Sequence, residues 1–542
     1  YLQDQAAFGV DMSKVEPGLG SRADMASQRQ ALQAAEEAYG QFLSFDRSRL
    51  TAEQQDTYDI YEFQTALALA LGDERFDYYA QQFESMGGLH YQLPTLLADW
   101  ALRSEEDVKG LVAVVQDVLP YVESALEYTK EQQARGLLMI DFDEVLGYCR
   151  GVLESGEDSA VLRAMNGSID ALGLAPEKAE EYKRQLKDAF TSSFLPAYEQ
   201  MVSVLEELQA SGANNEEGLA AFKHGREYYE LLMQAATGSG KTVEEVRAMM
   251  ERAMQQHIFR LQEVLMEAPD TLYALYGELP ATGYDSYEAI LDDIQSRMFE
   301  DFPKVSGLAY DIFDLDEEIA STSGITAYFN IPTLDGEAVR QLRVNPLTND
   351  VSSIATYSTV AHEGFPGHMY QYAYLYENVS SPWRKALADC PAYTEGYATY
   401  AQYAAFSYLD SVDSALLQAY RENEMLTNCA VILADIGIHY DGWTLEEMTD
   451  GLSSYGLEVN EAGAEGLYRQ LQANPCAFQP YYVGYEELLA MRESAQQALG
   501  GSFMEKGFHE AILKSGAAPF HVVQRNVDAY ISEASGGVPA AA

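Results

Sequence analysis

The stretch Thr359–Gln371 constrains the fold of this 542-residue chain more than any other segment. It places His362 and His368 six residues apart, with Glu363 directly after the first histidine. Neutral imidazoles bind zinc, and a carboxylate beside them can take a proton from water on the metal. These three side chains therefore predict a catalytic zinc site, provided that the fold brings the two histidines together.

The six-residue spacing requires a helix that breaks. On a straight helix, six residues rotate by about 240°, so the two imidazoles would point in different directions. Pro366 has no N–H to donate to the preceding turn, and Gly367 tolerates unusual backbone angles. We therefore predict a break or bulge at residues 365–367 that returns His368 toward His362. The alternative is a surface helix that ends at Pro-Gly beside two unrelated histidines.

A glutamate on a second helix is the expected third ligand. Glu395 lies in a stretch of small and aromatic residues, 392–400, with helical character. Two histidines and one glutamate leave a coordination position open for water, as a catalytic zinc site requires.

These motifs resemble the bacterial family known as domain of unknown function 885, whose members look like gluzincin-type zinc metallopeptidases. The family signature H-E-x-x-P-G-H-x-x-Q is similar to residues 362–371, and its E-G-W-A-like segment is similar to residues 395–398. Further similarity lies at residues 327–332, 435–444, 481–484, 491–492, 508–510 and 526–528, and weaker similarity at 88–94. This chain has Met369 and Tyr397 where members often carry histidine and tryptophan, which affects the pocket more than the metal.

The resemblance and the residues together predict a zinc metallopeptidase. We expect His362, His368 and Glu395 to hold one Zn²⁺ per chain, and Glu363 to act as the general base. The substrate would be a peptide. An exported zinc- or peptide-binding protein without turnover is the alternative from another functional class.

Three further residues are candidates for supporting roles. Asp435 and His439 are four apart in a predicted helix over residues 413–440, so they face the same side. We predict that His439 stabilises the oxyanion and that Asp435 orients a ligand imidazole, although both could form an ordinary helix-surface pair. Tyr481 could assist His439, or simply pack.

The pattern of residues predicts a mainly α fold, a large helical metallopeptidase-like architecture with a small β-sheet bordering the active-site cleft. Helical periodicity covers residues 27–72, 111–133, 142–153, 159–172 and 176–212. Ser104, which acidic residues follow, is a predicted N-cap ahead of the second of these ranges. Strands are predicted at 325–331 and 339–345, with a turn at 332–337. We divide the chain into an N-terminal helical portion (1–215), a catalytic portion (216–535) and a disordered tail (536–542).

The predicted sheet suggests how a substrate could bind. An exposed strand edge can align an extended peptide through main-chain hydrogen bonds, so Tyr328 and Asn330 are candidate substrate-binding residues. A purely structural hairpin is the alternative. Arg492 could bind a peptide carboxylate or form an ordinary salt bridge.

Composition excludes some classes of function. With 34 basic and 85 acidic residues, the formal charge of −51 disfavours binding to nucleic acid or anionic lipid. No run approaches the ~20 apolar residues of a membrane span.

The chain begins without methionine, so an export signal or lipid anchor ahead of it is plausible. We therefore expect a secreted or lipid-anchored protein rather than a cytoplasmic one. The four cysteines lack C-x-x-C spacing and could be buried thiols or include one disulfide.

Residues 235–242 resemble a phosphate-binding loop, which would indicate a nucleotide hydrolase. However, Ala235 stands where the pattern requires glycine, and a helix rather than a strand precedes it. A helix–helix connection with Thr242 as the N-cap of the next helix explains the segment better.

Overall fold

The chain is mainly α-helical with one small sheet, as predicted. The computed structural model describes residues 9–11, 14–315, 320, 326–334, 339–347 and 350–536. The predicted turn at residues 332–337 falls partly outside these residues, and so does the predicted tail except for Gly536. Among the described residues, no helix is both long and apolar enough to cross a membrane.

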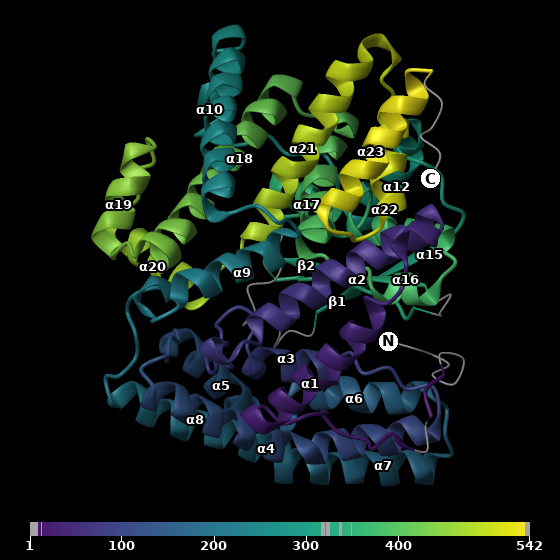
Figure 1. The fold of residues 1–542 in the computed structure, drawn as a ribbon. Coiled ribbons are helices and arrows are strands. Elements are labelled where there is room, and N and C mark those ends of the chain that lie inside the picture. Colours follow the sequence, from purple (N-terminus) through teal and green to yellow (C-terminus); the bar gives the residue numbers. More distant parts are fainter. Residues whose placement is uncertain are drawn as a thin grey trace.

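The first part of the chain forms a layer of helices, drawn in purple and blue in Figure 1. Ser104 begins the longest of them with the predicted cap, in which its hydroxyl accepts from the Asp107 N–H. The single helix predicted over residues 176–212 is interrupted by a π-helical turn, Phe190–Phe194. Most of the layer packs around its own apolar core, which includes Val115, Phe194 and Tyr198. The helices are α1 (Met25–Phe42), α2 (Ala52–Leu71), α3 (Leu89–Ala98), α4 (Glu105–Ala134), α5 (Phe142–Ser155), α6 (Ala160–Ala171), α7 (Pro176–Ala189) and α8 (Leu195–Ala210).

The segment that resembles a phosphate-binding loop joins two helices, as predicted. Helix α9 (Gly225–Thr237) ends at Gly238, whose φ of +58° is left-handed. Thr242 caps α10 (Val243–Glu267) in a capping box with Glu245. The Lys241 ammonium forms an ion pair with Glu487. The short α11 (Thr271–Leu275) and α12 (Tyr287–Arg297) follow.

The three strands form a mixed sheet of order β1-β3-β2. The predicted hairpin pair, β2 (Ala327–Asn330) and β3 (Arg340–Val344), is antiparallel. The sequence did not reveal β1 (Tyr310–Asp314), which lies parallel to β3. Within the described residues, β2 pairs on one side only, so it is an edge strand.

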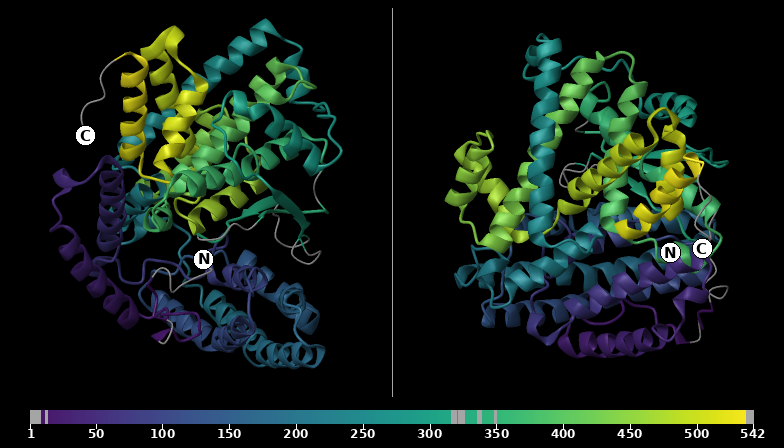
Figure 2. Two further views of the ribbon diagram at one scale, coloured as in Figure 1. Left: turned by 90° about the vertical axis from the view of Figure 1, so that its right-hand side faces the viewer. Right: turned by 45° about the horizontal axis from the view of Figure 1, so that its top comes forward.

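The remaining helices lie above the N-terminal layer in Figure 1, and the left view in Figure 2 shows the sheet between the two groups. They are α14 (Ile354–Glu363), α15 (His368–Asn378), α16 (Pro382–Ala386), α17 (Pro391–Ala404), α18 (Ser414–Ile436), α19 (Leu445–Ser454), α20 (Glu461–Ala473), α21 (Gln479–Leu499), α22 (Glu505–Ser515) and α23 (Phe520–Ala534). Ile60 and Met139, from the first portion, lie in the cores of this second group. The boundary predicted at residue 215 stays a prediction. All four cysteines are buried free thiols.

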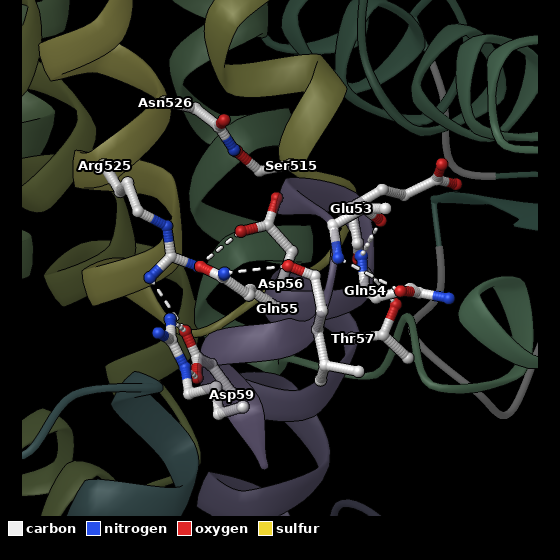
Figure 3. Close-up of polar contacts among 12 residues, drawn as sticks. Glu53, Gln54, Gln55, Asp56, Thr57, Asp59, Ser515, Arg525 and Asn526 are labelled. Atoms are coloured by element: carbon white, nitrogen blue, oxygen red, sulfur yellow. Dashed lines mark hydrogen bonds and ion pairs between the residues drawn. The ribbon is translucent and has the colours of Figure 1, made fainter. Parts of the chain in front are cut away.

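Ion pairs join the beginning of the chain to its end. Arg525 on α23 forms ion pairs with Asp56 and Asp59 on α2, as Figure 3 shows. Asp59 also accepts hydrogen bonds from Arg47. Residues more than 460 positions apart are therefore held together on one face.

Candidate metal centre

The helix carrying the first histidine ends at the predicted break. Helix α14 stops at Glu363, and α15 starts at His368. Between them, the Phe365–Pro366 peptide bond is cis. The Gly367 N–H donates to the carbonyl of Ala361, at 3.0 Å, so the chain folds back onto the last turn of α14.

Glycine is required at position 367 by this close approach. A Cβ atom there would lie 1.8 Å from the carbonyl oxygen of His362, which is far inside contact distance. The side chain of Phe365 is fully buried and packs edge-on against Tyr310 of β1. The Tyr397 hydroxyl donates to the carbonyl of Pro366 at 3.0 Å. The break is therefore held in place by neighbours from the sheet and from α17.

The third ligand is positioned by an equally close contact between two helices. Helices α17 and α21 cross at Gly396 and Gly484, where a Cβ on Gly396 would lie 2.3 Å from the Gly484 carbonyl carbon. Gly396 directly follows Glu395, and Tyr481 lies in the first turn of α21. The crossing therefore sets where both side chains lie.

The three predicted ligands converge. Oε2 of Glu395 lies 3.4 Å from Nε2 of His362 and 3.3 Å from Nε2 of His368. The two imidazole rings are nearly perpendicular, with centroids 4.7 Å apart. The histidine side chains are 10–11% exposed and that of Glu395 is 25% exposed, so solvent reaches the group. The predicted helical break thus brings together two nitrogens and one carboxylate oxygen, a donor set that suits zinc.

The other nitrogen of each imidazole has a glutamine partner. Nδ1 of His362 lies 2.8 Å from Oε1 of Gln402, and Nδ1 of His368 lies 3.4 Å from Oε1 of Gln371. Because an amide oxygen only accepts, each Nδ1 donates to its glutamine, so Nε2 is the nitrogen that faces Glu395 and would coordinate a metal ion. The ring orientations therefore fit a metal ion. Gln402 was missed in the sequence, although it lies seven residues after Glu395, two turns along the same helix face.

The pKa values of the ligand side chains also favour a positive charge at this position. Burial alone would lower the pKa of His368 and raise that of Glu395. Their hydrogen bonding and opposite charges outweigh burial, so the pKa of His368 is raised and that of Glu395 is lowered. A positive charge is thus favoured at the point where the three side chains meet.

Glu363 is held beside this group by the sheet. Its Oε2 accepts a hydrogen bond of 2.9 Å from the backbone N–H of Phe329 on β2. The charge of Glu363 acts on both His368 and Tyr481. This carboxylate is therefore anchored beside the group, and its role as general base stays a prediction.

Tyr481 also lies at the site, as predicted. Its ring stacks on that of His362, with centroids 6.2 Å apart and an angle of 20° between the planes. Burial, followed by the charges of Glu395 and Glu363, raises the pKa of the Tyr481 phenol, so the hydroxyl keeps its proton as a hydrogen-bond donor.

His439 does not have the predicted role, because both of its ring nitrogens are used inside the core. Nδ1 accepts from the Leu219 N–H at 3.1 Å, and Nε2 donates to the carbonyl of Leu471 at 2.9 Å. The ring is fully buried, and burial lowers its pKa. The neutral imidazole therefore ties together three segments of backbone and has no donor left for an oxyanion.

The prediction for Asp435 is corrected for the same kind of reason. Its oxygens accept from the Tyr229 hydroxyl at 2.6 Å, from the Gln479 amide at 2.8 Å and from the Cys476 N–H at 3.2 Å. The ligand imidazoles face Gln402 and Gln371 instead. Asp435 is a buried structural acceptor.

Of the candidate substrate-binding residues, Arg492 is not part of this centre. Its guanidinium forms an ion pair with Glu505 and lines a cavity of about 480 Å³ whose lining contains none of the three ligands. The Tyr328 hydroxyl donates to Asp99 of the N-terminal layer at 3.1 Å, so it fastens the sheet to that layer. Asn330 is half-buried on β2, and a role in substrate binding stays a prediction.

Two solved structures share the fold across nearly the whole chain. One is described as "the putative lipoprotein from Colwellia psychrerythraea", with 17% identity, a TM-score of 0.82 and coverage of 98% of this chain and 94% of that one. The other, "a putative lipoprotein of unknown function from Shewanella oneidensis", has 16% identity, a TM-score of 0.64 and coverage of 94% of each chain. No curated protein matches the chain. The family described as "Bacterial protein of unknown function (DUF885)" matches residues 8–527, and the chain belongs to that family.

Proposed function

We propose that the protein is a zinc-dependent peptidase of the gluzincin type. The observation that carries the proposal is the convergence of His362, His368 and Glu395 within 4.8 Å, with Glu363 anchored beside them. When bound, zinc would lower the pKa of a water molecule toward ~7 and polarise the scissile carbonyl.

The side chains around the ligands supply the remaining chemistry. Glu363 takes the proton from the attacking water and passes it to the leaving amine, because its position next to His362 puts it beside the reacting atoms. The protonated Tyr481 hydroxyl donates a hydrogen bond to the oxygen that becomes negative as the carbonyl is attacked. His439, fixed in the core, takes no part.

The edge of the sheet offers a place for an extended peptide. The Thr326 carbonyl accepts from the Asn345 N–H, so the ladder bonds of β2 fall on residues 326, 328 and 330. The N–H and C=O of Phe329 point away from β3, and the N–H donates to Glu363 while the C=O faces the open side. A substrate strand along this edge would bring its scissile bond to the three ligands.

The cellular location fits the same proposal. Both structural relatives carry the description "putative lipoprotein". We place the enzyme outside the cytoplasm, secreted or carried on a lipid anchor.

The test combines metal analysis with digestion of a peptide library. We expect about one catalytic zinc, lost in His368→Ala and in Glu395→Ala, and peptide cleavage that a chelator abolishes. Glu363→Gln should keep that zinc and lower kcat by about 10²–10⁴-fold. The control is Glu377→Gln. Glu377 lies on α15 but accepts its hydrogen bonds from Ser306, so this variant should keep both the zinc and the activity. Full activity in Glu363→Gln would refute the mechanism, and zinc binding without cleavage of any peptide would indicate a binding protein.

A further inference from the structure

A second group of potential metal ligands is buried where three long helices meet. His257 lies on α10, Cys429 on α18 and Glu486 on α21. One ligand atom from each lies within 4.8 Å of the other two. Their exposed fractions are 1%, 1% and 6%, so the group is closed to solvent, in contrast to the candidate catalytic centre.

The imidazole of His257 is held between two carboxylates. Nδ1 lies 2.6 Å from Oε2 of Glu422, and Nε2 lies 2.8 Å from Oε1 of Glu486. The other oxygen of Glu422 accepts from the Arg421 guanidinium, with 3.0 Å to Nε. Glu422 is therefore fixed by an arginine and accepts the Nδ1 proton, which is the arrangement that orients histidine ligands in metal sites. Nε2 is the nitrogen directed at Glu486.

We propose that His257 Nε2, the Cys429 thiolate and the Glu486 carboxylate bind a structural divalent transition-metal ion of the zinc class, with Glu422 holding the histidine in place. Nitrogen, thiolate and carboxylate donors together favour zinc over calcium or magnesium. Glu486 can complete a four-donor shell through its second oxygen. Side chains would move inward, since ligand atoms around a zinc ion lie about 3.3–3.8 Å apart.

Both ring nitrogens of His257 face a carboxylate, so both carry a proton in this arrangement. A divalent ion would displace the proton on Nε2 and the proton on Cys429 Sγ, which leaves the net charge of the buried group unchanged. The ion would tie α10, α18 and α21 together, and α21 packs against α17, which carries Glu395.

Cobalt(II) provides a probe that separates the two centres. A thiolate ligand gives Co²⁺ an intense charge-transfer absorption in the near ultraviolet, and the candidate catalytic ligands include no sulfur. We would load the metal-free full-length protein with Co²⁺ and record this band in the wild type and in Cys429→Ala. Cys149→Ala is the matched control, because Cys149 is an equally buried free thiol whose sulfur contacts Met201.

The wild type and Cys149→Ala should show the band, and Cys429→Ala should lose it together with one equivalent of metal. Glu486→Gln provides a second variant if Cys429→Ala fails to fold. A folded, cobalt-loaded wild type without the band would overturn the proposal and leave the group a buried ion-pair cluster. His368→Ala should keep the band, so failure at this site and failure of the proposed catalytic centre are distinguishable.

Discussion

Two glutamine side chains decide how the candidate ligand imidazoles are presented. Nδ1 of His362 donates to Oε1 of Gln402 at 2.8 Å, and this bond keeps Nε2 on the side of the ring that faces Glu395. Replacing Gln402 by leucine removes the acceptor while filling similar space. Since such partners typically contribute 10–100-fold in metal affinity, we expect Gln402→Leu to bind zinc about 10–100-fold more weakly, measured by competition with a chelator.

The controls separate metal orientation from general loss of stability. Gln132→Leu removes a fully buried amide that donates to backbone carbonyls of the N-terminal layer, so it should destabilise the protein without changing zinc affinity. Gln402→Glu keeps an acceptor and should restore tight binding. Unchanged affinity in Gln402→Leu would show that this bond does not orient the metal ligand.

At this scale the sequence predicts ligands better than their partners. His362, Glu363 and His368 are linked by local spacing, and Pro366 with Gly367 implies the break that brings them together. The prediction that His439 and Asp435 share one helix face was correct. However, their hydrogen-bond partners on that side lie more than 30 positions away in the sequence. Helical periodicity contains no information about those neighbours, so the predicted functional role was wrong.

Among the elements, α17 and α21 cross too closely to admit a side chain at Gly396. A methyl group on Gly396 would lie 2.3 Å from the Gly484 backbone, which cannot rotate away. We therefore expect Gly396→Ala to force the helices apart, to lower the free energy of unfolding by about 1–3 kcal/mol and to impair zinc binding at Glu395. Denaturant unfolding and zinc content measure the two effects.

Gly466→Ala is the matched control, since it lies within helix α20 with open space around the added Cβ atom. It should stabilise the protein by up to about 1 kcal/mol because glycine is a weak helix former. If Gly396→Ala matched this control, the close crossing would not be what positions Glu395.

Helices were predictable because their caps and breakers are local. Ser104, Thr242 and Pro176 begin helices where the sequence places them. Strand β1 was not, since its pairing with β3 joins residues about 30 positions apart in parallel. The π-helical turn at Phe190–Phe194 precedes Pro196, which cannot donate to the carbonyl four residues back, a local signal that the prediction of one helix over residues 176–212 did not use.

Across the whole molecule, two buried histidines make stability depend on pH. Burial lowers the pKa of His90 to about 4 and that of His509 to about 4, below the ordinary value of about 6.5. The unfolded chain therefore binds more protons between pH 6.5 and 4, so their contribution is complete above pH 6.5 and is lost as the pH falls toward 4. Each contributes about 3 kcal/mol by this linkage.

We expect His90→Leu to be less sensitive to acid than the wild type. Between pH 7 and pH 4, the wild type should lose about 3 kcal/mol more of its unfolding free energy than the variant does. Urea unfolding at each pH measures it, with the half-exposed His224→Gln as control. Parallel curves for His90→Leu and the wild type would mean that His90 titrates normally in the folded protein.

The ion pairs between α2 and α23 hold the ends of the chain together, and they differ from surface pairs in one respect. Asp59 is only 7% exposed, and burial opposes its negative charge, yet Arg47 and Arg525 lower its pKa. Without Arg525, Asp59 keeps its hydrogen bonds to Arg47. Asp56 then has no arginine partner among the residues that the structure describes (Figure 3). Arg525→Gln should therefore cost about 1–2 kcal/mol of unfolding free energy.

Arg260→Gln tests whether the burial of Asp59 explains the cost of losing Arg525. Arg260 pairs with Glu493 on the surface, so its loss should cost less than about 1 kcal/mol of unfolding free energy. A double-mutant cycle with Asp59→Asn isolates the contribution of the Arg525–Asp59 pair. Because the pKa of Asp59 is lowered by folding, that coupling should be complete above about pH 4 and disappear in stronger acid. A coupling energy of zero at pH 7 would mean that apolar packing alone joins α2 to α23.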